Sequence, residues 1–300
     1  MKIAKLLPWC LAACVLAAVQ GCTAVGAGQP LPAWQSPRLL DHPDTGRIVS
    51  LASGRVLDAV ELVGELAGEP LVLLGEKHDN PDHHALQLWL LQALERERAQ
   101  GSLVLEMLTS GQQLLVDGVR ARLAAGEAIA DLPAALEWSK GWDWQQYGPL
   151  VEYAVNRPWA LRAGNLDREA LMSIYRDPQP LQSGPAARPQ VQEQLGATIV
   201  ESHCGKLPDS QVPAMVAVQQ QRDLAMAGAL LDSASPGLLI AGSYHVRKDL
   251  GVPLHLQTLK PGQAFRVLIF LEAGQQVAPE MADYVWYTPA TEEKDYCADL

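Results

Sequence analysis

Short apolar runs that alternate with helical patterns constrain the fold of this chain most strongly. Residues 71–74 are apolar throughout and are followed by glycine, which is typical of a strand buried on both faces of a sheet. Similar runs occupy residues 103–105, 159–163, 237–241 and 266–271. Strands that alternate with helices predict an α/β fold with a mostly parallel sheet flanked by helices.

The segment between the second and third runs is too long for a simple crossover. It contains helical patterns over residues 112–123, 132–139 and 144–155. We therefore expect a small helical subdomain, inserted at about residues 108–157, over one end of the sheet.

The composition argues against one class of binding partner. The chain has 300 residues, 48% of them hydrophobic, which is enough for one large domain with a sizeable core. Its formal net charge is −11, and no run of Lys or Arg occurs in the body of the chain. Nucleic acid is therefore not an expected partner.

The first 22 residues have the pattern of an export signal. Lys2 and Lys5 precede an apolar stretch that is too short to remain as a membrane-spanning helix. The stretch ends in residues 19–22, which resemble the lipobox of bacterial lipoproteins and predict lipidation of Cys22. An ordinary signal peptide that happens to contain cysteine is the alternative. Thr23 favours the outer membrane by analogy with lipoprotein sorting.

These signals predict an outer-membrane protein that contacts the membrane only through a lipid at Cys22. Its soluble domain would lie in the periplasm or at the cell surface. Residues 23–45 are rich in Gly, Pro, Ala and Ser and predict a flexible tether, followed by the α/β domain over residues 46–300. Cys204 and Cys297 are the cysteines left after the signal, and they are either a disulfide or two buried free thiols.

Polar residues stand where four of the predicted strands end. Glu76 and His78 follow the first run, and Glu106, Asn165 and His245 follow three others. In an open parallel sheet, ligands bind outside the carboxyl ends of the strands. We therefore expect a functional site at this edge of the sheet.

The segment 75–84 adds His83 and His84 at the start of a helix, for which Asn80 is the expected N-cap and Pro81 the first residue. A structural interpretation is that the acidic residues here only complement the helix dipole while the histidines are solvated.

Two kinds of chemistry suit the strand ends. Carboxylates and imidazoles are ligands for zinc, manganese or iron, and they equally form a general acid and base. A metal-dependent hydrolase is therefore one hypothesis, with a divalent metal or the catalytic groups at Glu76, His78, Glu106 and His245. The spacing is not that of an HExxH metalloprotease, and neither a phosphate-binding glycine loop nor a GxSxG elbow occurs.

A longer set of motifs resembles one family. These are residues 75–84, Glu106-Met107, Gly141-Trp142, Tyr147, residues 164–166, 203–205, 220–223 and 245–253. Together they resemble the ChaN family of haem-associated bacterial lipoproteins, in the wider group of Tiki-type proteases and erythromycin esterases. The similarity spans roughly residues 45–298.

This resemblance implies non-covalent haem binding by a homodimer at the outer membrane during haem and iron uptake. An outer-membrane haem receptor is then a further candidate partner. Within the family, a tyrosine contacts the iron and a histidine of the partner chain contacts a propionate. The haem-binding function is the leading hypothesis, the hydrolase is the alternative, and a purely structural lipoprotein is the third.

The haem contacts of the family suggest candidate haem-binding residues in this chain. Tyr147 is the first candidate for the iron, followed by Tyr153, Tyr175 and Tyr244. Tyr244 stands where the family usually has a small residue, so it narrows the pocket or adds a ligand. His78 is expected at the sheet edge, and His83 and His84 are expected to reach a propionate or the neighbouring subunit. The remaining candidates for cofactor binding are Asn165, Arg222, His245 and Arg247.

Overall fold

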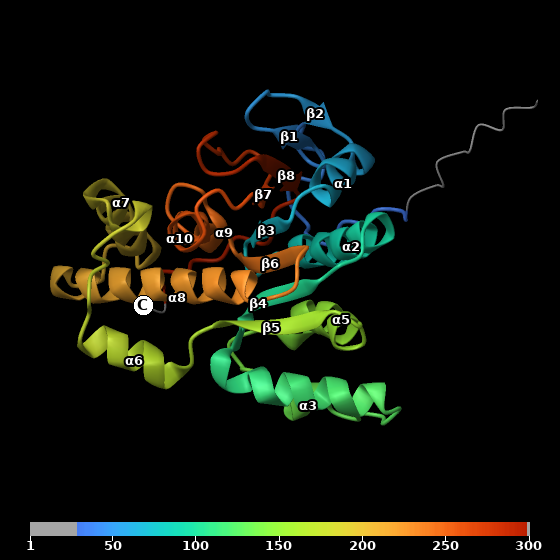
Figure 1. Cartoon of the computed structure of the whole chain (residues 1–300). Helices are drawn as coiled ribbons and strands as arrows, with labels where there is room; N and C mark the ends of the chain where they lie inside the picture. The colour runs from blue at the N-terminus through green and yellow to red at the C-terminus, as the bar shows by residue number, and fades with distance from the viewer. Residues whose placement is uncertain (1–28, 299–300) are drawn as a thin grey trace, which may run out of the picture.

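An eight-stranded sheet forms the centre of the protein in the computed structural model, which describes residues 29–298 (Figure 1). The strand order is β2-β1-β8-β7-β3-β6-β4-β5. The strands are β1 (Ile48–Ser50), β2 (Val56–Leu57), β3 (Leu71–Glu76), β4 (Ser102–Thr109), β5 (Ala160–Asn165), β6 (Gly237–Gly242), β7 (Arg266–Glu272) and β8 (Tyr284–Thr288).

The sheet is mostly parallel, which confirms the predicted α/β fold. Strands β8, β7, β3, β6, β4 and β5 run parallel to one another, whereas β1 is antiparallel to both β8 and β2. Strand β8 was not predicted and was expected to be part of an ordered tail. It is only five residues long, and its residues do not alternate between buried and exposed positions, so its pattern is weak.

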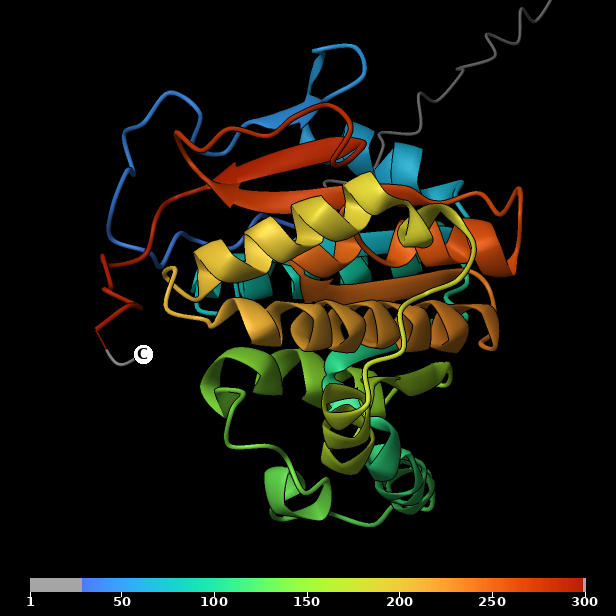
Figure 2. The same ribbon diagram turned by 90° about the vertical axis from the view of Figure 1, so that its left-hand side faces the viewer.

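Helices cover both faces of the sheet. They are α1 (Ala59–Ala67), α2 (Pro81–Glu97), α3 (Gln113–Ala124), α4 (Leu132–Ala135), α5 (Trp144–Val155), α6 (Arg168–Arg176), α7 (Pro189–Ser202), α8 (Val212–Leu231), α9 (Ser243–Val246) and α10 (Val252–Leu259). Figure 2 shows α7 and α8 in front of the strands.

Successive side chains of β3 point to opposite faces of the sheet, and this explains why both faces are packed. Val72 and Leu74 join the core formed with α1, α2 and α5. Leu71 and Leu73 point the other way and join the core formed with α8 and α10. All six residues of β3 are buried, as expected for a central parallel strand.

The helical insertion lies along the β5 edge of the sheet (Figure 1). Val116 of α3 and Leu150 and Val151 of α5 belong to the same core as α1, α2 and the sheet. These helices therefore extend the main core rather than forming a separate one.

The described part of the expected tether is bound to the body. We name residues 29–45 the N-terminal strap. The Asp82 carboxylate accepts hydrogen bonds from the backbone N–H groups of Gln35, at 2.7 Å, and Ser36, at 3.0 Å. Trp89 Nε1 donates to the carbonyl oxygen of Gln29 at 3.0 Å. These contacts tie the strap to α2 at several points. Residues 1–28, with Cys22, lie outside the described residues.

The C-terminal segment crosses the strand ends and is fixed by a disulfide. Tyr296 donates to the Asp79 carboxylate at 2.5 Å. Cys204 and Cys297 are bonded to one another, with their Cα atoms 5.8 Å apart, so the structure selects the disulfide over two free thiols. Between residues 29 and 298, no helix is long and apolar enough to cross a membrane.

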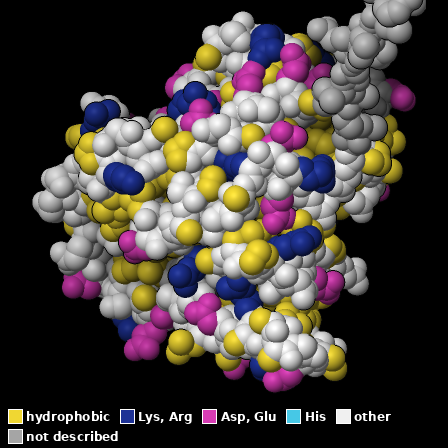
Figure 3. Space-filling model, turned by 45° about the vertical axis from the view of Figure 1, so that its right-hand side comes forward, with side chains coloured by type: hydrophobic (Ala, Val, Ile, Leu, Met, Phe, Trp, Pro, Cys, Tyr) yellow, Lys and Arg dark blue, Asp and Glu magenta, His cyan; other side chains and the backbone are white. Residues whose placement is uncertain are grey.

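Charged side chains of both signs are intermixed on the face in Figure 3. This face presents no continuous block of Lys and Arg.

Gly75 permits the close approach of α9 to β3, and its replacement tests this packing. A Cβ atom at Gly75 would lie 2.5 Å from Val246 Cγ2 and 3.0 Å from Ser243 Cα. Gly75→Ala should therefore lower the free energy of unfolding by about 1–3 kcal/mol, measured by urea denaturation.

The control is Gly64→Ala in α1, where an added Cβ meets nothing within 4 Å. Because alanine favours a helix interior, this change should raise stability by about 0.5–1 kcal/mol. Equal effects of the two substitutions would contradict the packing described here.

Candidate functional site

A cavity of about 770 Å³ opens at the carboxyl ends of the central strands. We name it the strand-end pocket. Its polar lining includes Glu76, Lys77, His78, Glu106, Gln219, Arg222, Ser243, Tyr244, His245 and Arg247. Its apolar lining includes Trp142, Ile269, Phe270, Leu271, Val277 and Met281. The predicted edge of the sheet is therefore a concave site with both polar and apolar walls.

Glu76 lies at the end of β3 and is buried. Its carboxylate accepts hydrogen bonds from Tyr147 Oη at 2.5 Å and from Gln87 Nε2 at 2.6 Å. The ring nitrogens of His78 and His84 lie 3.0 and 3.2 Å from it. Burial by itself would raise the pKa of Glu76, but His84 and His78 hold this pKa well below its usual value. Glu76 is therefore ionised, and its carboxylate fixes the positions of the side chains around it.

His78 is the exposed member of this group, with 43% of its side chain accessible. Its Nδ1 faces Glu76, and its ring packs edge-on against Trp142 with centroids 4.9 Å apart. A Cβ atom at position 242 would lie 2.8 Å from His78 Nε2, so Gly242 is needed beneath the ring. Burial opposes protonation, but Glu76 raises the pKa of His78. Nε2 of His78 therefore lies at the pocket, on an imidazole ring whose protonated form is favoured.

Glu106 forms the second buried centre, on β4. Its carboxylate accepts hydrogen bonds from Arg222 Nη2 at 2.5 Å and from the Gly242 backbone N–H at 2.8 Å. Burial would raise the pKa of Glu106, but His245 and Arg222 lower it. Arg222 also donates from Nε to the Asn165 side-chain oxygen at 3.1 Å. Asn165 in turn donates to the backbone carbonyl of Glu106 at 3.1 Å. Asn165 therefore positions Arg222 rather than lining the pocket.

His245 lies between two carboxylates. Its Nδ1 is 2.5 Å from Asp223 Oδ1, and its Nε2 is 3.3 Å from Glu106 Oε1. Burial by itself would lower the pKa of His245, but Glu106 and Asp223 raise it to about 9. The two carboxylates therefore favour the imidazolium form of His245.

The structure divides the expected metal set into two groups. Glu76 pairs with His78, and Glu106 pairs with His245. In the described part of the chain, no group of three or more His, Cys, Asp or Glu residues has the geometry to hold a metal ion. Sequence spacing could not reveal this separation, because β6 lies between β3 and β4.

His83 and His84 do not line the strand-end pocket, and both side chains are buried. His83 Nδ1 accepts from the Lys77 backbone N–H at 2.9 Å, and its Nε2 lies 3.0 Å from Thr288 Oγ1. Burial lowers the pKa of His83 to about 3, so it stays neutral. His84 donates from Nε2 to the carbonyl oxygen of His78 at 3.0 Å. Neither can reach a propionate in the strand-end pocket.

Tyr147 is also misplaced for contact with iron. Its side chain is 1% exposed, and its hydroxyl is taken up by Glu76. Burial and Glu76 raise its pKa far above the usual value, so it remains a phenol. Tyr153 donates to Glu95 away from the pocket. Among the four candidates only Tyr244, which is 51% exposed, lines the strand-end pocket.

Arg247 lies in the pocket wall beside Tyr244. Its guanidinium is held by Asp249 in a bidentate pair at 2.9 and 2.5 Å, and it lies 5.9 Å from the centre of the Tyr244 ring. The ion pair with Asp249 holds the planar guanidinium of Arg247 at the wall of the pocket.

Three residues of the site were not predicted from the sequence. Asp223 and Gln219 contact His245, and Gln87 contacts Glu76. Asp223 and Gln219 are four residues apart on α8, so they share one side of the helix. Polar residues at this spacing on an otherwise apolar helix are the signal that could have identified them.

The pKa of His245 tests whether this side chain is ion-paired with Asp223 and Glu106. Its folded pKa of about 9 exceeds the value of 6.5 expected for an unfolded chain. The resulting stabilisation, about 3 kcal/mol, is complete below pH 6.5 and is lost as the pH rises through 9. Asp223→Asn should lower the pKa of His245 and flatten this loss, measured by histidine NMR and by urea unfolding at several pH values.

Asp249→Asn is the matched control, because its carboxylate pairs with Arg247 and does not contact His245. This change should leave the histidine titration nearly unaltered. A His245 resonance that titrates near pH 6.5 in the unsubstituted chain would contradict the ion pairing.

Comparison with known proteins identifies the family. The family model described as haem-binding uptake, Tiki superfamily, ChaN, matches residues 62–256. ChaN of Campylobacter jejuni, described with cofacial haem binding, is 30% identical with a TM-score of 0.73, over 80% of this chain and 95% of that one.

More distant structures have lower scores. A mutant of the erythromycin esterase EreC is 13% identical with a TM-score of 0.46, over 88% of this chain and 85% of that one. The toxin effector domain RRSP of Vibrio vulnificus is 17% identical with a TM-score of 0.44, over 80% and 39%. No curated protein matches this chain. From the family match and the similarity to ChaN of Campylobacter jejuni, we conclude that the chain belongs to the ChaN family of haem-binding uptake proteins in the Tiki superfamily.

Proposed function

We propose that this protein binds haem in the strand-end pocket, with Tyr244 as the residue that meets the iron. The observation that carries the proposal is the exposed phenol of Tyr244 at a pocket that combines an apolar wall with basic side chains. Tyrosine is an established protein ligand of haem iron. The proposal replaces Tyr147 with Tyr244 as the first candidate.

The residues of the pocket fit haem. A cavity of 770 Å³ lies within the range of about 300–1,000 Å³ that is usual for small-molecule sites. Trp142, Val277 and Met281 are partly exposed and offer apolar surface for a flat macrocycle. The basic side chains of His78, Arg222 and Arg247 face the same space and suit carboxylate groups such as propionates.

Haem supplies the iron centre when it is bound, and the chain supplies its environment. Glu76 holds Nδ1 of His78 and leaves Nε2 at the pocket. Glu106 and Asn165 fix the guanidinium of Arg222. These contacts orient positive charge before any ligand arrives, which lowers the entropy lost on binding.

The cellular role that follows is haem and iron uptake at the outer membrane, with the protein anchored through a lipid on Cys22. The signal-like residues 1–22 support this role. The cofacial haem of ChaN from Campylobacter jejuni supports a homodimer of this chain, which sedimentation of the haem complex tests. A dimer requires the molar mass to double when haem binds.

Haem titration tests the binding proposal. The purified protein should give a Soret band that saturates at one haem per chain. Tyr244→Phe removes only the phenol oxygen, so it should weaken binding at least about tenfold and change the visible spectrum, since the proposed iron ligand is lost.

Tyr175→Phe is the control, because Tyr175 lies on α6 and does not line the pocket. It should bind haem as the unsubstituted chain does. No spectral change at micromolar haem would overturn the function, and an unaltered spectrum in Tyr244→Phe would overturn the choice of ligand.

The lipid anchor is tested at Cys22. Cys22→Ala should remove the lipid from the mature protein, as read by mass spectrometry, and should deplete it from the outer-membrane fraction. Cys14→Ala, within the same apolar stretch, should change neither result. An outer-membrane location that survives the loss of Cys22 would argue against this anchor.

A further inference from the structure

The C-terminal segment, residues 291–298, contacts the loop that carries His78. Asp79 Oδ2 accepts hydrogen bonds from Tyr296 Oη at 2.5 Å and from Lys294 Nζ at 3.3 Å. Figure 2 shows this segment in dark red, where it passes the carboxyl ends of the strands before it reaches the C-terminus. The residue after His78 is therefore held by the end of the chain.

The residue before His78 is held by the same segment. Lys77 lines the strand-end pocket, and its Nζ donates to Thr291 Oγ1 at 2.7 Å. This Nζ also lies 5.9 Å from the centre of the Tyr296 ring. Both sequence neighbours of His78 are therefore restrained from outside the pocket, so displacement of the segment would give the His78 ring more freedom to move.

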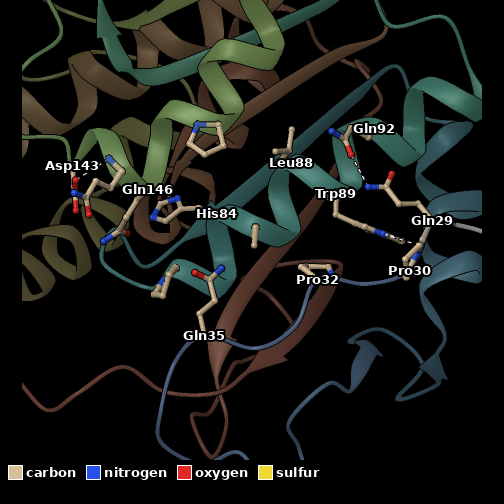
Figure 4. Close-up of a pocket in the computed structure, with 14 residues that line it drawn as sticks. Gln29, Pro30, Pro32, Gln35, His84, Leu88, Trp89, Gln92, Asp143 and Gln146 are labelled. Atoms are coloured by element: carbon tan, nitrogen blue, oxygen red, sulfur yellow. Dashed lines mark hydrogen bonds between the residues drawn. The ribbon is translucent and has the colours of Figure 1, made fainter.

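The N-terminal strap supports the other end of this loop through buried contacts. Ser36 donates from Oγ to Asn80 Oδ1 at 3.3 Å, and its backbone N–H donates to Asp82 at 3.0 Å. Ser36, Asn80 and Asp82 are all buried. Figure 4 shows the strap beside α2, where Trp89 donates to Gln29. Noncovalent contacts therefore fix this side of the loop.

The C-terminal segment has weaker noncovalent support. Residues 292–296 are all exposed. Ion pairs between exposed side chains contribute little to stability, and chain ends are poorly ordered unless they are tied down. The disulfide between Cys204 and Cys297 joins the segment to the turn after α7. This covalent bond is therefore the main restraint that keeps the segment against the His78 loop.

Two features favour exchange of this disulfide with thiols. Cys204 and Cys297 are both partly accessible to solvent. The backbone φ angle of Cys204 is 57°, in the left-handed region that is unfavourable for a residue with a side chain. Exposed or strained disulfides are the ones that are reduced most readily.

We propose that the Cys204–Cys297 disulfide is a redox switch that controls the position of His78 at the strand-end pocket. A dithiol opens it, such as the paired cysteines of a thiol–disulfide oxidoreductase. One thiolate of the dithiol attacks a sulfur of the disulfide, and its second thiol then resolves the mixed disulfide. The dithiol is oxidised to a disulfide, and Cys204 and Cys297 take up two electrons and two protons. The freed segment leaves Asp79, and the loop 77–79 loosens.

The effect of this switch on haem rests on the proposed function. His78 is one of the basic side chains assigned to the propionates, so a loosened loop should weaken haem binding. The oxidised protein then retains haem, and the reduced protein releases it. The position of His78 in the haem-free protein tests the switch separately.

Dithiothreitol treatment of the haem-free protein tests the switch. The reagent should open the bond, as read by alkylation of Cys204 and Cys297 and mass spectrometry, while the far-UV circular dichroism stays unchanged. The NMR signals of the His78 ring should shift, whereas those of His255, buried on α10, should not. A disulfide that stays closed in the folded protein, or one that opens without a change at His78, would overturn the proposal.

Tyr296→Phe tests the contact while the disulfide stays intact. It removes the hydroxyl group bonded to Asp79, so it should shift the His78 signals of the oxidised protein. In a Cys297→Ser background it should have no further effect, because the segment has already left Asp79. Additive shifts would contradict the switch.

Glu293→Gln is the matched control, because Glu293 pairs with Arg38 and not with the His78 loop. It should leave the His78 signals unchanged.

Haem titration of Cys297→Ser tests the link to haem. Its dissociation constant should be about tenfold higher than that of the unsubstituted chain, since the His78 loop is no longer held. An equal affinity despite shifted His78 signals would overturn this link. If neither chain binds haem, the proposed function fails, and the His78 signals still decide whether the switch exists.

Discussion

Two buried carboxylates at the carboxyl end of the sheet determine the arrangement of the groups around them. Glu76 on β3 and Glu106 on β4 flank β6, and both are essentially inaccessible to water. An unpaired buried carboxylate costs several kcal/mol, so each must be surrounded by donors or cations. The positions of His78, Arg222 and His245 follow from this requirement.

The two carboxylates are satisfied from different parts of the chain. Glu76 is satisfied mainly by α2 and by Tyr147 of α5, whereas Glu106 is satisfied by α8 and by the last residue of β6. The helices on both faces of the sheet are thereby joined at one edge. Gly242 lies between the groups, since its N–H donates to Glu106 and its lack of a Cβ leaves room for His78.

Much of the fold could be predicted from the sequence, because a short, fully apolar run such as residues 71–74 is typical of a strand buried on both faces of a sheet. The convergence of the four strand ends followed from parallel topology, and the strand order confirms it. Short elements were harder to predict, since β8 has too few residues for its periodicity to be distinctive. The contacts that hold the strap to Asp82 could not be predicted, because a Pro- and Gly-rich segment has the same composition whether it is free or bound.

Side-chain direction was the main limit on predicting the site. His83 and His84 belong to the same short histidine-rich segment as His78, yet their side chains are buried at the start of α2 whereas that of His78 is exposed. The sequence placed Tyr147 ahead of Tyr244 as the candidate for the iron, and only the structure shows that the phenol of Tyr147 is buried and that of Tyr244 exposed. Asp223 was overlooked because its partner, His245, is distant in sequence.

A crystal structure of the haem complex would test the central claim most directly. We predict haem in the strand-end pocket, with the Tyr244 oxygen on the iron and propionates near His78, Arg222 or Arg247. Haem bound outside the strand-end pocket, or iron bound by a residue other than Tyr244, would contradict this prediction.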